Sequence, residues 1–160
     1  MKKSKLFLDI DGVLNTKEFI GNADFHSAIY SNRPFIKSKL NFNDDCVNRV
    51  KLLQQSYNLD VVICSNWRYG VNGSHFLQIF KLFDWNLETI AMTDTLLDES
   101  EVKRSKIIEK YILENYVQKY VILDDTIENY ESLFDNLVLT DRKIGFTFDD
   151  YRKAETILSQ

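Results

Sequence analysis

Two aspartates one residue apart, Asp9 and Asp11, are the first residues of this sequence whose type and spacing suggest chemistry. They follow a short apolar run, residues 6–8, and precede Gly12, an arrangement typical of a strand that ends in a sharp turn. Parallel α/β sheets bind ligands outside the carboxyl ends of their strands, so we expect both carboxylates to face such a site. Two close carboxylates repel each other unless a cation or a proton lies between them. The pair therefore indicates a divalent metal and acid–base chemistry.

A second apolar run that ends in acids strengthens this interpretation, because a pair of aspartates after one strand is often only a turn. Residues 120–123 form that run, and Asp124 and Asp125 follow it. With Thr126 next in the chain, these acids also fit a turn in which an aspartate side chain begins the following helix. The presence of two strands that end in acids favours a functional site over turns alone.

The composition limits the class of protein. The chain has 160 residues, 44% hydrophobic and 28% charged, which suits a single domain with a buried core. No apolar stretch approaches the roughly 20 residues of a membrane-spanning helix, so we expect no membrane partner. Cys46 and Cys64 are too few for a disulfide framework or a zinc cluster and suit a reducing cytoplasm. The net charge of −4 excludes a basic field over the whole molecule and leaves a local basic surface open.

The elements that must position the acids alternate along the chain. Continuous apolar and β-branched runs predict five strands buried on both faces, at Lys5–Asp9, Asp60–Cys64, Leu87–Met92, Tyr120–Leu123 and Leu137–Thr140. Helices are expected between the strands. Asn43, Ser74 and Ser100 are the expected N-caps of three of them, and shorter helices are expected near Ile127–Phe134 and Asp149–Leu158. This alternation predicts a Rossmann-like α/β fold, with a mostly parallel five-stranded sheet between helices.

The hydrophobic residues of segment 15–42 follow neither the helical nor the strand periodicity. We expect this segment to form a small lid within a single domain of residues 1–160. Residues 17–42 contain four cations and two acids, a net charge of +2, with five interleaved aromatic residues, Phe19, Phe25, Tyr30, Phe35 and Phe42. Aromatic rings beside cations suit contact with a single nucleic-acid strand. They also suit a lid that packs on its own aromatic side chains, which is the commoner case.

Taken in order, these motifs resemble those of the haloacid dehalogenase (HAD) superfamily of phosphotransferases over nearly the whole chain. Residues 8–14 (Leu-Asp-Ile-Asp-Gly-Val-Leu) resemble its first motif and Ile63-Cys64-Ser65 its second. Lys103 or Arg104 falls where the third is expected, and residues 122–125 resemble the fourth. More narrowly, the chain resembles the HAD domain of Swiss-Army-knife RNA repair proteins in three stretches, residues 65–68, 104–112 and 137–145. That pattern usually has a second small or hydroxyl residue where this chain has Asn66.

The resemblance implies an Mg²⁺-dependent phosphatase that forms an aspartyl-phosphate. Asp9 would attack phosphorus, while Asp11 would protonate the leaving oxygen and then take a proton from the hydrolytic water. Asp9, Asp124 and Asp125 would hold Mg²⁺ together with the backbone carbonyl of Asp11. The hydroxyl of Ser65 would hold a phosphoryl oxygen.

The cation that neutralises the transferring phosphoryl group is Arg104 or Lys103. At about 100° per residue, Arg104 shares a helical face with Ile108 and Tyr111 and points inward, whereas Lys103 lies to one side. We therefore favour Arg104 and keep Lys103 as the alternative. Arg68 fits bidentate contact with a substrate phosphate and fits equally an ion pair with a surface acid.

A small lid leaves the site open, which the resemblance associates with bulky or polymeric phosphates. A terminal phosphate on RNA or DNA, as in nucleic-acid repair, is therefore the first substrate class. The enzymatic alternative is a small phosphomonoester such as a nucleotide or a sugar phosphate, and the other alternative is a non-catalytic phospho-ligand binding module. Every position that the chemistry needs is filled, which favours an enzyme. We expect Trp67 to pack in the fold rather than to stack on a base.

Overall fold

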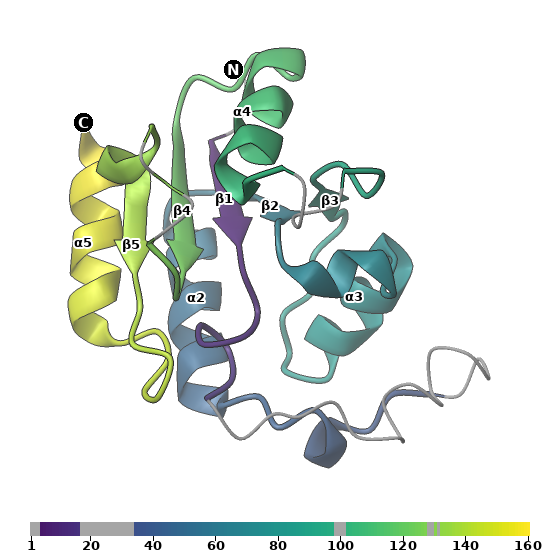
Figure 1. Ribbon diagram of the computed structural model, residues 1–160. Coiled ribbons are helices and arrows are strands. Elements are labelled where there is room, and N and C mark those ends of the chain that lie inside the picture. Colours follow the sequence, from purple (N-terminus) through teal and green to yellow (C-terminus); the bar gives the residue numbers. More distant parts are fainter. Residues whose placement is uncertain (1–3, 17–33, 98–101, 128–129, 131) are drawn as a thin grey trace.

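Five parallel strands form one sheet in the order β3-β2-β1-β4-β5 (Figure 1). The computed structural model describes residues 4–16, 34–97, 102–127, 130 and 132–160. The strands are β1 (Lys5–Leu8), β2 (Asp60–Ile63), β3 (Ala91–Met92), β4 (Tyr120–Asp124) and β5 (Leu137–Leu139). The predicted Rossmann-like α/β fold is confirmed, and the sheet is parallel at every pairing.

Helices cover both faces of this sheet. The α-helices of the described residues are α2 (Asp44–Ser56), α3 (Gly73–Lys81), α4 (Arg104–Glu114) and α5 (Phe148–Ser159). Short 3₁₀ helices are η1 (Lys37–Lys39), η2 (Asn66–Tyr69) and η3 (Phe134–Asn136). Successive strand residues point to opposite faces. Leu6 and Leu8 accordingly join the core formed with α2, α3 and α5, whereas Phe7 packs with Ile108 and Tyr111 of α4.

Side-chain caps fix where the helices begin, and one of them differs from the prediction. Asn43 caps α2 as expected, since its side-chain oxygen accepts from the backbone N–H of Asp45 at 2.9 Å. The prediction that Ser74 caps α3 is wrong. Asn72 is the cap, because its side chain accepts from the backbone N–H of His75 at 3.0 Å and the His75 ring accepts in return, which closes a capping box.

A further predicted element differs from the structure. The strand expected at Leu87–Met92 pairs with β2 only at its last two residues, Ala91 and Met92, whereas Leu87 and Ile90 pack against the core. Within the segment near Ile127–Phe134, where a helix is expected, residues 128, 129 and 131 lie outside the described residues, and residues 132–133 form a turn that leads into η3. Ser100, the predicted cap of the next helix, lies outside the described residues, and α4 begins at Arg104.

The expected lid is described only at its two ends, because residues 17–33 lie outside the described residues. These ends meet at an antiparallel bridge between Asn15 and Phe42, and the returning segment with η1 runs below the strand ends in Figure 1. The lid and the single-domain boundaries of 1–160 stay predictions. None of the described helices has both the length and the apolar character required to cross a membrane.

Candidate active site at the carboxyl edge of the sheet

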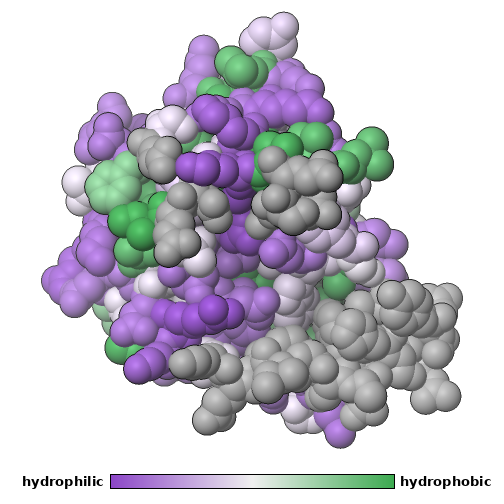
Figure 2. Space-filling view, viewed as in Figure 1, coloured by the Kyte–Doolittle hydropathy of each residue, from purple (hydrophilic) through white to green (hydrophobic). Residues whose placement is uncertain are grey.

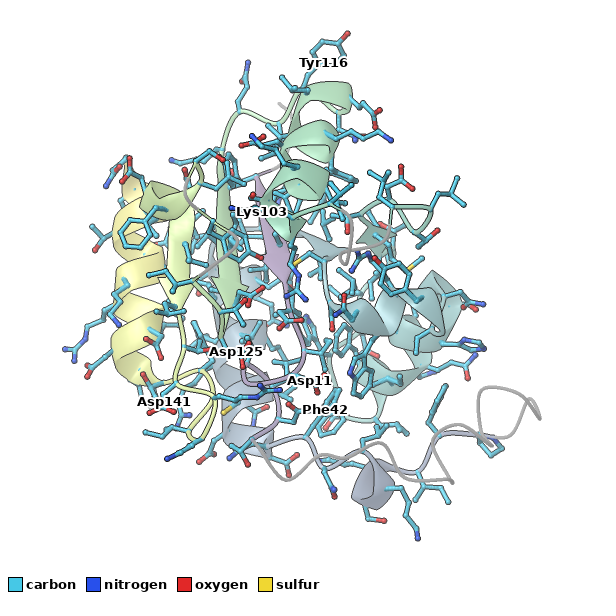
Figure 3. All side chains as sticks on the ribbon, in the orientation of Figure 1. Asp11, Phe42, Lys103, Tyr116, Asp125 and Asp141 are labelled. Atoms are coloured by element: carbon cyan, nitrogen blue, oxygen red, sulfur yellow. The ribbon has the colours of Figure 1, made fainter. Side chains whose placement is uncertain are left out.

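The ends of β1 and β4 bring the two acid pairs together. These strands are neighbours at the centre of the sheet, and Leu8 pairs with Leu123 in their register. Carboxylate oxygens of Asp9, Asp124 and Asp125 therefore lie within 4.8 Å of one another. Figure 3 shows Asp125 and Asp11 at this same edge, and Figure 2 shows hydrophilic side chains at the centre of the same view.

Asp9 is buried among charges, and its carboxylate is disfavoured there. Only 4% of the residue is exposed. Burial, followed by repulsion from Asp124, raises the pKa of Asp9 to about 8, although the charge of Arg104 and a hydrogen bond with Ser65 oppose the shift. Burial and the charge of Asp124 also raise the pKa of Asp125. Both shifts have the same cause, since burial and the neighbouring Asp124 disfavour further negative charge in this cluster.

Arg104 is the cation inside this cluster. Its Nη1 lies 2.5 Å from Oδ2 of Asp124 and 3.4 Å from Oδ2 of Asp9, and the residue is 7% exposed. Lys103, at the cap position of α4, is exposed (Figure 3). The structure therefore has Arg104 pointing inward, as its place on the helical face predicts.

Asp124 is held by the protein at both of its oxygens. Oδ1 accepts from the backbone N–H and the hydroxyl of Thr126, at 2.9 and 2.8 Å. Oδ2 accepts from the Tyr130 hydroxyl at 2.7 Å and from Arg104. The predicted turn and the predicted acid cluster are thus both present at this residue. Sequence reasoning missed Tyr130, because its spacing from Asp124 matches no familiar motif.

Asp125 has a buried oxygen, Oδ2, with no hydrogen-bond partner among the described residues. The Nε atom of Arg142, on an exposed side chain, lies 3.3 Å from that oxygen but not in hydrogen-bonding geometry. Gly12 packs against the carboxylate, since a Cβ at this position would lie 2.4 Å from Oδ2, and its φ of +75° also favours glycine. A buried carboxylate oxygen that accepts no hydrogen bond from the described residues, beside two other carboxylates, fits a hard divalent cation. Arg142 was not anticipated from the sequence.

Asp11 is held by two uncharged donors. Nδ2 of Asn15 donates to its Oδ1 at 2.8 Å, and Nε1 of Trp67 donates to its Oδ2 at 2.9 Å. Trp67 also packs against Phe42, with 5.6 Å between ring centroids, so the predicted packing role is present together with a polar one. Sequence reasoning missed Asn15, and the only signal for Trp67 was its position two residues after Ser65.

Ser65 follows β2 and lies next to Asp9, and Arg68 belongs to η2, which begins directly after Ser65. Ser65 is buried and caps η2, where its hydroxyl accepts from the backbone N–H of Trp67 at 3.4 Å. Arg68 is 3% exposed, and its Nη1 donates to the backbone carbonyls of Cys64 and Ser65 at 2.9 and 3.0 Å. Arg68 therefore fixes the loop that carries Ser65, a role that sequence reasoning did not consider. Contact with a substrate phosphate stays a prediction.

A parallel α/β sheet with acids after its first and fourth strands and a buried serine after its second defines an HAD-type domain. More narrowly, the sequence model of the family described as "HAD domain in Swiss Army Knife RNA repair proteins" matches residues 5–151, and the chain belongs to this family. The resemblance noted from the motifs is thereby confirmed. No curated protein and no solved structure matches the chain.

Proposed function

We propose that the protein is an Mg²⁺-dependent phosphomonoester hydrolase that acts through an aspartyl-phosphate on Asp9, with a terminal phosphate on RNA or DNA as its first substrate class. The observation that carries the proposal is the buried cluster of Asp9, Asp124 and Asp125 at the carboxyl edge of the sheet, with Arg104 inside it. Membership of an HAD family supports phosphatase chemistry for such a cluster.

Mg²⁺ would be held by Asp9, Asp124 and Asp125 together with the backbone carbonyl of Asp11. Oδ2 of Asp125, which accepts no hydrogen bond from the described residues, supports this assignment, and so does the oxygen-only ligand set. When bound, the ion would neutralise the carboxylates and the phosphoryl oxygens and so reduce the repulsion between nucleophile and phosphate.

In the first half-reaction, a carboxylate oxygen of Asp9 forms a bond to phosphorus as the bond to the leaving oxygen breaks. Asp11 donates its proton to that leaving oxygen, so the product leaves as an alcohol. Arg104 and Ser65 lie beside Asp9 and would stabilise the charge on the transferring phosphoryl group. In the second half-reaction, the carboxylate of Asp11 takes a proton from water, which attacks phosphorus, releases phosphate and restores Asp9.

The nucleic-acid part of the proposal is supported by the family description, which names RNA repair proteins. The described end of the insertion adds Lys37, Lys39 and the aromatic Phe42, which packs on Trp67 next to Asp11. A nucleotide or sugar phosphate is the alternative substrate, and a binding module without catalysis is the alternative function. A reducing cytoplasm stays our prediction for the location, because both cysteines are free.

The test is phosphate release in the presence and absence of Mg²⁺ from 3′- and 5′-phosphorylated oligonucleotides, mononucleotides and sugar phosphates. Asp9→Asn is the inactive variant, and Asp84→Asn, at an exposed position, is the matched control. Release that requires Mg²⁺ and Asp9 and is fastest from an oligonucleotide end supports the whole proposal. Preference for a small phosphate removes the nucleic-acid assignment. No Asp9-dependent release from any substrate contradicts the catalytic function.

A further inference from the structure

We propose that Trp67 and Asn15 are positioning residues that hold the carboxylate of Asp11 in the orientation required for proton transfer. The inference rests on the proposed function, in which Asp11 serves as general acid and then as general base. Both residues act through Asp11, and neither needs to touch the substrate.

Each oxygen of Asp11 has its own donor. The indole Nε1 of Trp67 lies 2.9 Å from Oδ2, and the amide Nδ2 of Asn15 lies 2.8 Å from Oδ1. A carboxylate bonded at both oxygens cannot rotate about its terminal torsion without breaking a hydrogen bond. Proton transfer to a leaving oxygen requires hydrogen-bond distance and alignment, and a small misplacement of the acid reduces the rate strongly.

The two donors are themselves fixed, and they come from different elements. Asn15 is 1% exposed, and its side-chain oxygen accepts from the backbone N–H of Gly12 at 3.0 Å, so its amide cannot turn freely. Trp67 belongs to η2 after β2, and its ring packs against Phe42. Asp11 is therefore held between the loop after β1 and the loop after β2.

The two donors of Asp11 are uncharged side chains, so they hold its carboxylate through directional hydrogen bonds rather than through an ion pair. Asp11 is also partly exposed, so water is available to its oxygens and folding alone does not require two side-chain donors.

The test is Trp67→Phe, which keeps an aromatic ring at the position that packs on Phe42 and removes the indole N–H together with part of the ring. Its matched control is Trp85→Phe, which removes an indole N–H that donates to Gln54 at 3.2 Å in the core. Two substrates are compared by kcat/KM: the best nucleotide or sugar phosphate, whose alkoxide must be protonated, and p-nitrophenyl phosphate, whose leaving group needs no proton.

We expect Trp67→Phe to lower kcat/KM about tenfold for the alkyl phosphate and less than about twofold for p-nitrophenyl phosphate. Asp11→Asn should give the same pattern with a larger loss, and Trp67→Phe added to Asp11→Asn should cause little further loss, because both changes act at one residue. Asn15→Ala should give the same pattern of kcat/KM as Trp67→Phe. If Asn15→Ala does not fold, the result for Trp67→Phe decides the test.

Equal losses on both substrates, no loss on the alkyl phosphate, or additive losses with Asp11→Asn would overturn the positioning role. The positioning role would also be overturned if Trp85→Phe lowered kcat/KM selectively for the alkyl phosphate. Failure of the proposed function is distinguishable, because wild-type protein would then release no phosphate that depends on Asp9, and the positioning role would fall with it.

Discussion

Asp124 and Asp125 are adjacent in the sequence, yet the structure surrounds their carboxylates very differently. Asp124 is fully buried and accepts hydrogen bonds at both oxygens, from Thr126, Tyr130 and Arg104. Oδ2 of Asp125 is also buried but has no hydrogen-bond partner among the described residues. The comparison teaches that Asp124 is held in place by protein donors at both oxygens, whereas Oδ2 of Asp125 has only the ion pair with the exposed Arg142.

The difference arises from the alternation of side chains along β4. Asp124 is the last residue of the strand and shares the face of Ile122, which packs with α4. Arg104, at the start of α4, reaches Asp124 for this reason, and it reaches Asp9 because Asp9 follows Phe7 on the same face. Asp125 falls beyond the strand and lies against Gly12 instead.

The largest effect is expected at Asp9, which lies against both carboxylates. We expect Asp9→Asn to reduce phosphate release by at least about 10³-fold, because the amide is a poor nucleophile. The same change should stabilise the metal-free protein at pH 8, because it removes one of three clustered carboxylates. Phosphate release and thermal unfolding in EDTA measure the two effects. An active variant, or one less stable than wild type at this pH, would contradict the prediction.

The next effect separates Asp124 from Asp125 directly. Asp124→Asn leaves the buried Arg104 without its closest carboxylate, so we expect the free energy of unfolding to fall by about 3 kcal/mol in denaturant titrations. Asp125→Asn should leave stability within about 1 kcal/mol of wild type and weaken Mg²⁺ binding by about tenfold in calorimetry, because it removes one ligand charge. Matching effects of the two substitutions on the free energy of unfolding would break the comparison.

The sequence was sufficient to predict the sheet and the meeting of the acids, because these depend on local signals. Apolar runs located the strands, Asn43 marked the start of α2, and the helical face of Arg104 predicted its inward direction. The capping error at Ser74 also had a local origin, since a better cap, Asn72, lies two residues earlier.

The contacts that distinguish one acid from another could not be predicted, because they join residues far apart in the chain. Trp67 donates to Asp11 across 56 positions, and Arg142 reaches Asp125 from a turn after β5. No periodicity or motif records the direction of such side chains. The contrast between Asp124 and Asp125 therefore had to come from the structure.

The raised pKa of Asp9 predicts how the stability of the metal-free protein depends on pH. An unfolded aspartate titrates near 3.8 and Asp9 at about 8, so between these values the folded protein keeps a proton that the unfolded chain has lost. Stability therefore falls as pH rises through this window. We expect the Tm in EDTA to fall by about 5 °C between pH 5 and pH 8. The fall should be smaller in Asp9→Asn, and an unchanged slope in that variant would assign it to other groups.

The smallest effect is expected at Arg142, whose exposed side chain forms an ion pair with Oδ2 of Asp125. Exposed ion pairs contribute about 0–1 kcal/mol, and a cation bound at Asp125 must compete with this guanidinium. Arg142→Gln should therefore raise Mg²⁺ affinity about threefold, measured by calorimetry at low salt. Lys143→Gln, in the same turn, makes the same charge change and should have a smaller effect, because no contact with the cluster is recorded for it among the described residues. Equal gains in both variants would mean that general electrostatics, rather than the pairing with Asp125, governs the affinity. A loss of affinity in Arg142→Gln would mean that Arg142 assists the cation, and Asp125 would then be less available to a ligand than its missing hydrogen bond indicates.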